Sequence, residues 1–182
     1  FWCAGGQGQL MKITAIDDRQ DLFSVQDVFP NELINDLKKI PLDTVPFTKM
    51  EWQEDKPRRR LAQMPGSIFA KIHDYINEQK QILGKVLGKD VSHIDTAFWY
   101  DLEGFTFATH VDNPGVKDVL QVYLSDCSNA GTVFYNDEQE RIKFEFKTNT
   151  GYLMMNNKNQ KHGVPNTVGK DDIRLSIYCW IQ

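Results

Sequence analysis

The sequence predicts a mainly β domain with helices in its N-terminal half: an antiparallel sandwich or barrel with the helices packed outside it. Three observations support this fold class. The chain has 182 residues, of which 41% are hydrophobic, and this suits one domain with a substantial core. Short β-rich runs follow one another from His93 onward, separated by clusters of Gly, Asn, Asp and Pro. Apolar residues at helical spacing occur before that point.

The N-terminal half holds the predicted helices. Residues 11–17 (MKITAID) are predicted to form a strand, and residues 28–40 a short helix with its apolar residues on one face. A longer helix is predicted over residues 65–88, where apolar positions again recur at helical spacing. Between the helices, residues 43–65 are rich in proline and have no sustained period. This segment is either a functional lid or binding loop, or a mobile segment with no catalytic role.

The C-terminal half holds the predicted strands. Seven runs there are rich in β-branched and aromatic residues, and turn-forming residues lie between them. The predicted strands cover residues 93–101, 105–111, 119–125, 131–136, 141–147, 151–156 and 172–181. So many short strands in a row favour a sandwich or barrel.

Composition excludes some classes of function. Lys and Arg number 21 against 25 Asp and Glu, and the net charge of −4 gives no general attraction to nucleic acid or anionic lipid. The basic run over residues 56–60 (KPRRR) lacks interleaved aromatic residues, so we expect a solvated loop rather than a nucleic-acid contact. No apolar run approaches the ~20 residues of a membrane span, and no signal peptide is recognisable.

Two further expectations concern the compartment and the N-terminus. Cys3, Cys127 and Cys179 form no C-x-x-C motif and cannot all pair, which is typical of a reducing compartment, so we expect a cytoplasmic protein. Residues 1–10 (FWCAGGQGQL) precede Met11 and are rich in Gly and Gln. We expect them to be an added tail, with a single domain over residues 11–182.

A candidate metal site begins with His110 and Asp112. On a strand, side chains two positions apart point to the same face, so an imidazole and a carboxylate can reach one ion. This pattern alone is weak, because His93 and Asp95 have the same spacing. His162 strengthens it, since it lies 52 residues after His110, and sandwich folds bring distant strands together. Two histidines and one carboxylate form the facial triad that suits non-haem Fe(II).

Arg174 is the second candidate. It lies 12 residues after His162 on an apolar run and shares a face with Ser176 and Tyr178. An arginine inside a barrel needs an anion, and its planar fork matches a carboxylate. The alternative is that Arg174 faces outward and pairs with Asp171 or Asp172. Together with the triad, an inward carboxylate clamp is the favoured interpretation.

These residues resemble a known family. His110-x-Asp112, His162 and Arg174-x-Ser176 are similar to the signature of the Fe(II)/2-oxoglutarate-dependent oxygenases, over roughly residues 95–181. The prolyl-hydroxylase-like branch is most similar, since the prolyl hydroxylases of hypoxia-inducible factor share the string HVDNP. The resemblance implies a double-stranded β-helix (a cupin-like jelly roll) over residues 93–182, supported by helices packed on one sheet. It also implies Fe(II) on the triad, with 2-oxoglutarate and dioxygen as cosubstrates.

The resemblance assigns roles to further residues. Tyr123 and Ser176 are expected to help Arg174 hold the distal carboxylate of 2-oxoglutarate. Tyr100, ten residues before His110, is expected near the metal-bound cosubstrate, the alternative being a buried aromatic residue. Since family members place variable loops over the metal, the 43–65 loop supplies the candidate substrate contacts, which are Trp52, Arg58, Arg59 and Arg60.

The predicted reaction is hydroxylation of an unactivated C–H bond, with release of succinate and CO2. In this family Asp112 favours hydroxylation over halogenation, and Trp180 stands where nucleic-acid demethylases carry a second arginine. The expected substrate is a peptidyl or free amino acid. The alternatives are a cupin-like metal-dependent isomerase or hydrolase that uses no 2-oxoglutarate, and a non-catalytic jelly-roll binding module. His73, in the long helix, is expected to be structural.

Overall fold

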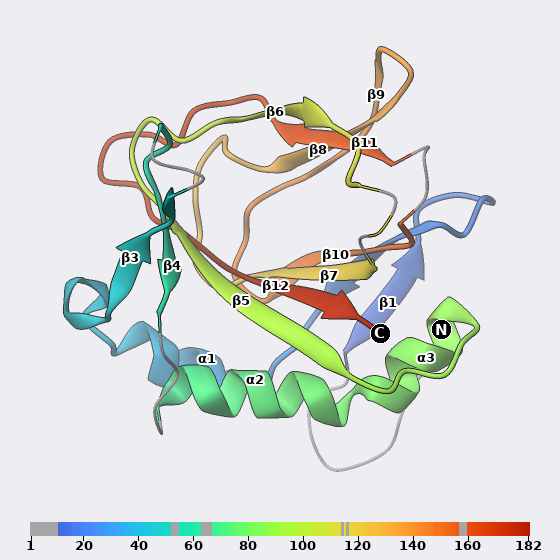
Figure 1. Cartoon of the computed structure of the whole chain (residues 1–182), viewed down its shortest axis with the longest axis horizontal. Helices are drawn as coiled ribbons and strands as arrows, with labels where there is room; N and C mark the ends of the chain where they lie inside the picture. The colour runs from blue at the N-terminus through green and yellow to red at the C-terminus, as the bar shows by residue number, and fades with distance from the viewer. Residues whose placement is uncertain (1–10, 52–54, 63–66, 114, 116, 157–159) are drawn as a thin grey trace.

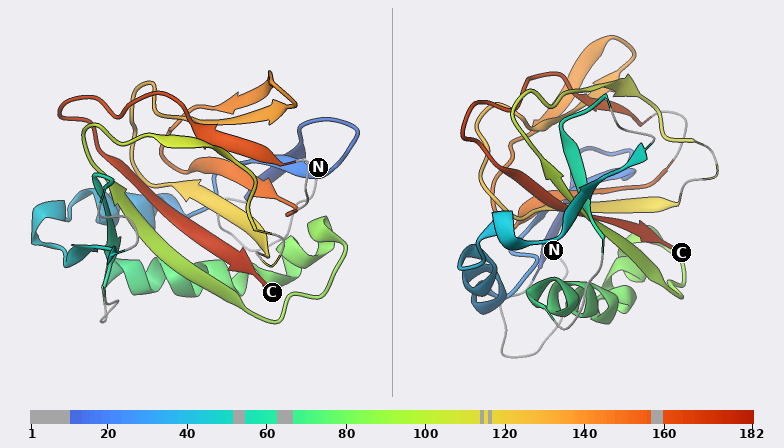
Figure 2. Two further views of the ribbon diagram at one scale, coloured as in Figure 1. Left: turned by 45° about the horizontal axis from the view of Figure 1, so that its top comes forward. Right: turned by 60° about the vertical axis from the view of Figure 1, so that its left-hand side comes forward.

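The computed structural model describes residues 11–51, 55–62, 67–113, 115, 117–156 and 160–182. The expected tail, Cys3 and Trp52 lie outside the described residues. Two antiparallel sheets face each other (Figures 1 and 2), as predicted. The large sheet has the order β1-β2-β10-β7-β12-β5-β4-β3, and the small sheet has the order β6-β11-β8-β9.

The strands of the large sheet are β1 (Lys12–Ala15), β2 (Leu22–Gln26), β3 (Phe47–Lys49), β4 (Arg58–Leu61), β5 (Ile94–Asp101), β7 (Asp118–Tyr123), β10 (Thr150–Met154) and β12 (Arg174–Ile181). Those of the small sheet are β6 (Phe107–His110), β8 (Thr132–Asn136), β9 (Gln139–Phe144) and β11 (Lys161–Val164). All seven predicted C-terminal runs are strands. β2, β3, β4 and β11 were not predicted.

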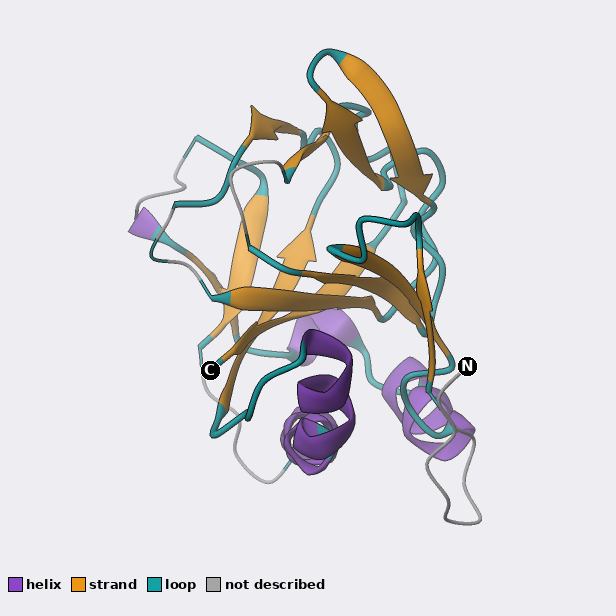
Figure 3. Cartoon of the chain, turned by 90° about the vertical axis from the view of Figure 1, so that its right-hand side faces the viewer, coloured by secondary structure: helices purple, strands orange, loops and turns teal. Residues whose placement is uncertain are grey.

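Three helices cover the outer face of the large sheet, on the side away from the small sheet (Figures 1 and 3): α1 (Asn31–Lys38), α2 (Ile68–Glu78) and α3 (Lys80–Leu87). The prediction of one helix over residues 65–88 was wrong in part. The chain leaves helical geometry at Gln79 (φ −84°, ψ 5°), which ends α2 and begins α3. None of the described helices is both long enough and apolar enough to cross a membrane.

The large sheet has an apolar core on each face. One core lies between the sheet and the helices, where Ile72 and Ile76 of α2 and Phe98 of β5 are buried. The other lies between the two sheets and is rich in aromatic rings, including Phe105, Tyr123 and Phe134. Because successive side chains of a strand alternate between faces, each central strand supplies both cores.

The segment between the first two helices differs from its prediction. Residues 43–65 were expected to be an irregular loop, but β3 and β4 form a hairpin at the edge of the large sheet, and β4 pairs with β5. The basic run is therefore largely a strand rather than a solvated loop. Alternation along β4 turns Arg58 and Arg60 to one face and Arg59 to the other.

Candidate metal centre

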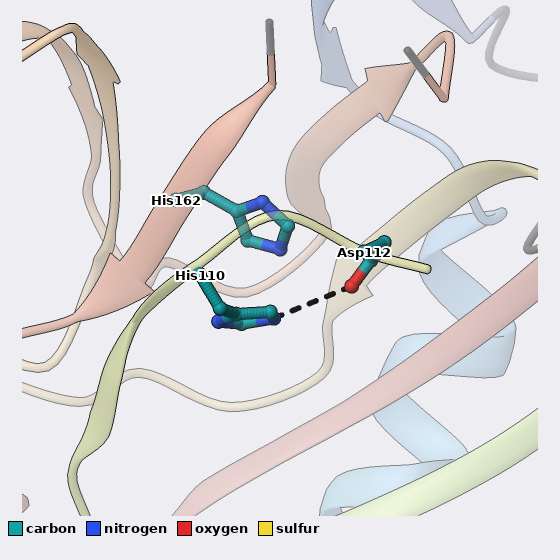
Figure 4. A group of neighbouring side chains, drawn as sticks. All are labelled: His110, Asp112 and His162. Carbon is teal, nitrogen blue, oxygen red and sulfur yellow. Dashed lines mark ion pairs between the residues drawn. The ribbon is translucent and has the colours of Figure 1, made fainter. Parts of the chain in front are cut away.

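Neighbouring strands of the small sheet bring the predicted triad together. His110, at the end of β6, lies directly opposite His162 on β11, and Asp112 follows two residues later. Ligand atoms of the three side chains lie within 4.8 Å of one another. Figure 4 shows both imidazoles and the carboxylate pointing toward one another. This spacing lets one ion contact all three side chains.

A glycine makes this close approach possible. Gly163 follows His162, and a Cβ at that position would lie 2.9 Å from the carbonyl oxygen of Phe107 and 3.0 Å from the Cα of Thr109. Any other residue would press β11 away from β6. The pairing of the two strands is irregular here, with a register shift between His162 and Val164. Gly163 and this irregular strand pairing together set the position of His162.

Backbone carbonyls fix which nitrogen of each imidazole is available. Nδ1 of His110 lies 2.9 Å from the carbonyl oxygen of Ala108, and Nδ1 of His162 lies 2.9 Å from that of Gln160. A carbonyl oxygen only accepts hydrogen bonds, so Nδ1 of each ring carries the proton. In the neutral ring Nε2 then keeps its lone pair, as a metal-binding histidine requires. At His110 a second proton, on Nε2, would donate to Asp112.

Asp112 has two partners on its carboxylate. Nε2 of His110 lies 3.3 Å from Oδ1, and the Tyr178 hydroxyl donates a hydrogen bond to Oδ2 at 3.1 Å. Burial disfavours the charged carboxylate, but these hydrogen bonds and the nearby His162 outweigh burial and lower the pKa of Asp112. Burial also raises the pKa of Tyr178 well above 10, so its hydroxyl stays a donor. Asp112 is thus held as an oriented anion.

The two histidines differ in their protonation. Burial lowers the pKa of His162, which keeps this imidazole neutral at neutral pH. Burial acts in the same direction on His110, but the hydrogen bonds to Asp112 and Ala108 outweigh it, and the pKa of His110 is raised. A metal ion entering the site therefore competes with a proton mainly at His110.

A cavity of about 380 Å³ opens beside the triad. Its walls are largely aromatic, and the rings that line it belong to Trp99, Phe105, Phe107, Tyr152, Tyr178 and Trp180. The polar groups in the wall include the three triad residues and two arginines, Arg58 and Arg174. An apolar pocket with a few convergent polar groups is typical of a small-molecule site.

Arg174 points inward, as the carboxylate-clamp interpretation predicted. Only 1% of its side chain is exposed, and its Nη1 donates a hydrogen bond to Asp101 Oδ2 at 2.5 Å. Its Nε donates to the carbonyl oxygen of Ala130 at 2.9 Å. The alternative of an outward arginine paired with Asp171 or Asp172 was wrong, because β12 turns this side chain toward the small sheet.

Arg58 shares the same aspartate. Arg58, Asp101 and Arg174 lie directly opposite one another on β4, β5 and β12. Arg58 Nε donates to Asp101 Oδ1 at 2.6 Å, and its guanidinium lies 4.3 Å from the ring centre of Trp99. Asp101 is fully buried. Two buried cations therefore flank one buried anion in a single row across the sheet.

Comparison with solved structures places this arrangement in a known fold. A prolyl hydroxylase from Trichoplax adhaerens, in complex with a peptide fragment of the hypoxia-inducible factor oxygen degradation domain, has a TM-score of 0.69 at 13% identity. The match covers 92% of this chain and 87% of that one. A prolyl-4-hydroxylase from Pseudomonas putida has a TM-score of 0.70 at 13% identity, over 92% of this chain and 96% of that one. The chain has the fold of the 2-oxoglutarate–Fe(II) oxygenases.

A third structure supports the same fold. An oxidoreductase of the 2OG-Fe(II) oxygenase family from Burkholderia pseudomallei has a TM-score of 0.68 at 10% identity, over 100% of this chain and 93% of that one. No family model matches the sequence, and no curated protein matches it either. The predicted double-stranded β-helix is confirmed, and the resemblance is confirmed at the level of the oxygenase fold.

Within this oxygenase fold, Tyr123 and Ser176 are buried close to Arg174. The Tyr123 hydroxyl donates to Thr132 Oγ1 at 2.9 Å, and its ring stacks on Phe146, which also lies under the Arg174 guanidinium. Burial raises the pKa of Tyr123 to about 12. The hydroxyl of Ser176 accepts a hydrogen bond from the Gln121 amide at 3.1 Å. Gln121 and Thr132 line the cavity. Tyr123 and Ser176 do not line it but are hydrogen-bonded to these two residues.

Two predicted contacts point away from the cavity of the oxygenase fold. Tyr100 lies between Trp99 and Asp101 on β5 and so faces the opposite side of the large sheet, where its ring packs 5.1 Å from that of Phe47. The prediction of a cosubstrate contact for Tyr100 was wrong, and the alternative of a packed aromatic residue describes it. Arg59 is exposed on that face too, so its predicted substrate contact was also wrong.

The remaining histidines lie outside the candidate site. His93 and Asp95 form an exposed pair at 2.9 Å, and they belong to no cluster of three candidate ligands in the described part of the chain. His73 of α2 binds the Thr96 hydroxyl through Nδ1 at 2.7 Å. That contact joins a helix to β5, which is the structural role expected of His73.

The sequence interpretation missed two residues of the site. Asp101 ends an apolar strand, and Tyr178 was noted only for sharing a face with Arg174. Each carried a signal, because an acid within an apolar run needs a cation, and Tyr178 is four residues from Arg174 on one strand face. Their partners depend on strand pairing, and the sequence does not show which strands are neighbours.

Proposed function

We propose that this chain is an Fe(II)- and 2-oxoglutarate-dependent oxygenase that hydroxylates an unactivated C–H bond of a peptidyl or free amino acid. One observation carries the proposal: a His–Asp–His cluster with Nε2 lone pairs available lines the same cavity as the buried guanidinium of Arg174. The first group suits a non-haem Fe(II) ion and the second suits a carboxylate. The oxygenase fold agrees with both.

The donor set fits the proposed metal. Two neutral imidazoles and one carboxylate are the facial triad of non-haem iron oxygenases and leave other coordination positions open. Bound together, Fe(II) and 2-oxoglutarate supply the activation of dioxygen, the release of succinate and CO2, and the oxidation of the C–H bond. His110, Asp112 and His162 would hold the metal, and Tyr178 would orient the carboxylate of Asp112.

The surrounding side chains would bind 2-oxoglutarate and exclude water from the cavity. Arg174 would take the distal carboxylate of 2-oxoglutarate, with Tyr123 and Ser176 supporting that end of the cavity from behind Thr132 and Gln121. The aromatic walls limit the entry of water, which strengthens every charge interaction inside. The protein's contribution is thus to bind, orient and shield the reacting groups.

The proposed substrate class rests on the similar solved structures and on the residues of the cavity wall. Two of the similar structures are described as prolyl hydroxylases, one of them in complex with a peptide. In this chain Trp99 and Trp180 line the cavity, and the Arg60 guanidinium lies 5.7 Å from the Trp99 ring. Lys56 lies 4.3 Å from the Phe107 ring. Cationic groups beside aromatic rings of the cavity wall suit a peptide or an amino acid with a carboxylate.

One observation favours a second candidate function. Asp101 already gives Arg174 a carboxylate partner, so the guanidinium has a use without 2-oxoglutarate. A zinc-dependent hydrolase or isomerase on the same three ligands would need no clamp for a cosubstrate. A substitution of Arg174 by Leu separates the two, because it should greatly raise the 2-oxoglutarate concentration needed for turnover and spare a hydrolase or isomerase.

The test is turnover of 2-oxoglutarate by the protein loaded anaerobically with Fe(II) and then exposed to air. Succinate release would be measured alone and with proline-containing peptides, free proline and other free amino acids. We expect slow release alone and at least about tenfold stimulation by the substrate, because substrate and cosubstrate react together. No succinate under any condition, with Fe(II) bound, would exclude the proposed function.

A further inference from the structure

The row Arg58–Asp101–Arg174 is a second feature of the cavity, beyond the single arginine that the sequence predicted as a clamp. Its three side chains come from three adjacent strands; Arg58 and Arg174 line the cavity, and Asp101 lies between them in the row. The exposed side-chain fractions are 11% for Arg58, 0% for Asp101 and 1% for Arg174. Side chains this deeply buried stay charged only when opposite charges are paired with them.

The charges of these three side chains do not balance one another. Two guanidinium groups and one carboxylate leave a net charge of +1. Both oxygens of Asp101 are engaged, since Oδ1 accepts from Arg58 and Oδ2 accepts from Arg174. Asp101 therefore has little capacity left to neutralise the second cation, and a carboxylate ligand would complete the row.

The arginines also keep donors for such a ligand. Arg174 uses Nη1 and Nε in its hydrogen bonds, and its Nη2 donates to none of the residues that the structure describes. Arg58 directs Nε and Nη2 at Asp101, 2.6 Å from Oδ1 and 3.5 Å from Oδ2, and its Nη1 donates to none of the described residues. Its guanidinium lies 4.3 and 4.7 Å from the ring centres of Trp99 and Phe105, and stacking on aromatic faces fixes the direction of the remaining N–H groups. The remaining donors of the two arginines, beside one carboxylate, form a receptor for a second carboxylate.

We propose that Arg58, Asp101 and Arg174 form a two-arginine anion receptor whose net charge of +1 sets the affinity for the distal carboxylate of 2-oxoglutarate. This inference rests on the proposed function, because it assigns a ligand to the same cavity. Arg58 acts as a second binding cation, contributed by β4 rather than by the C-terminal strands. Asp101 is a positioning residue that holds the two cations in one row.

The charges give the receptor a testable signature. Arg58→Gln leaves a neutral Asp101–Arg174 pair, whereas Asp101→Asn leaves two cations. The double variant Arg58→Gln/Asp101→Asn returns the row to a net charge of +1 with Arg174 alone. If net charge controls binding, the double variant binds 2-oxoglutarate more tightly than Arg58→Gln does. A purely structural role for the row predicts the reverse, because two deletions then damage the site more than one.

The experiment is calorimetric titration of the Mn(II)-loaded protein, anaerobically, with 2-oxoglutarate and with oxalate, which has no distal carboxylate. We expect Arg58→Gln to weaken 2-oxoglutarate binding by at least about tenfold, since hydrogen bonds to charged groups contribute strongly. Oxalate binding should change by less than about twofold, because oxalate contacts the metal end alone. The double variant should recover most of the lost affinity. Arg59→Gln, which removes the same charge from the exposed face of β4, is the matched control.

Four outcomes overturn the inference. Equal 2-oxoglutarate affinities in Arg58→Gln and Arg59→Gln would remove Arg58 from the site and leave the proposed function standing. A double variant weaker than Arg58→Gln would show a structural role, and equal losses for oxalate would show general damage. If the wild type binds oxalate and Mn(II) but not 2-oxoglutarate, the proposed function fails and the receptor fails with it.

Discussion

At the scale of single residues, the site depends on hydrogen bonds that fix orientation before a metal arrives. Backbone carbonyls hold Nδ1 of both histidines, and Tyr178 holds the carboxylate of Asp112. Because these partners lie outside the triad, they set geometry without contacting the ion. Partners of this kind typically change metal affinity when they are removed.

Tyr178→Phe tests that orientation. The variant loses only the hydroxyl that donates to Asp112, so we expect Mn(II) affinity to fall by about tenfold with little change in thermal stability. Isothermal titration calorimetry measures the affinity. Tyr100→Phe is the matched control, because Tyr100 packs on the helix side of β5, and its affinity should equal that of the wild type. Equal affinities for Tyr178→Phe and the wild type would contradict this role.

The protonation of His110 gives the metal site a pH dependence. The metal-free chain holds the pKa of His110 above its ordinary value of 6.5, so a proton competes with the metal at higher pH than it would at a free histidine. Mn(II) affinity should therefore fall as pH is lowered through that raised pKa, with release of about one proton per metal ion bound. Titrations in buffers of different ionisation enthalpy count the protons. An affinity that is flat from neutral to mildly acidic pH would contradict this.

At the scale of elements, the small sheet positions the histidines because β11 lies very close to β6. This strand was not predicted, since KHGV is only four residues long and carries no clear alternation. The spacing of His110 and His162 suggested that two strands meet, but it did not reveal which strand carries His162. Register and bulges come from neighbours far along the chain, which a local pattern does not contain.

Gly163→Ala tests the close packing of β11 on β6. A Cβ at 2.9 to 3.0 Å from the backbone of β6 must push the strands apart. We expect a loss of about 1–3 kcal/mol in the free energy of unfolding, together with weaker Mn(II) binding. Chemical denaturation and calorimetry measure the two effects.

Gly115→Ala is the control for that substitution. A Cβ at Gly115, on the loop after Asp112, meets nothing within 4 Å. This variant should lie within about 0.5 kcal/mol of the wild type and bind Mn(II) as the wild type does. Equal behaviour of the two alanine variants would show that the approach of β11 to β6 does not set the site.

At the scale of the whole molecule, the large sheet separates support from chemistry. Its outer face packs on the helices, and its inner face carries Asp101, Arg174 and Tyr178. The sequence predicted this division, because helical and β-rich segments occupy different halves of the chain. It did not predict that Arg58, from the N-terminal half, reaches the inner face, because the pairing of β4 with β5 joins segments that no local pattern connects.

Ile76→Ala tests the supporting role of the helices. Ile76 of α2 is fully buried against the outer face, and its truncation should lower the free energy of unfolding by about 2–5 kcal/mol. Mn(II) affinity, measured well below the melting temperature, should stay within about twofold of the wild type, since distant sites act independently. A parallel loss of affinity would mean that support and chemistry are not separate.

The central claim is that one cavity binds Fe(II) on the triad and 2-oxoglutarate beside Arg174. The most direct measurement is the visible absorption spectrum of the protein under anaerobic conditions, after Fe(II) alone and then after 2-oxoglutarate. The account predicts a weak charge-transfer band that appears only with both, that is absent in His162→Ala, and that requires much more 2-oxoglutarate in Arg174→Leu. Tight Fe(II) binding with no new band at any concentration of 2-oxoglutarate would contradict the account and favour a metal-dependent hydrolase or isomerase.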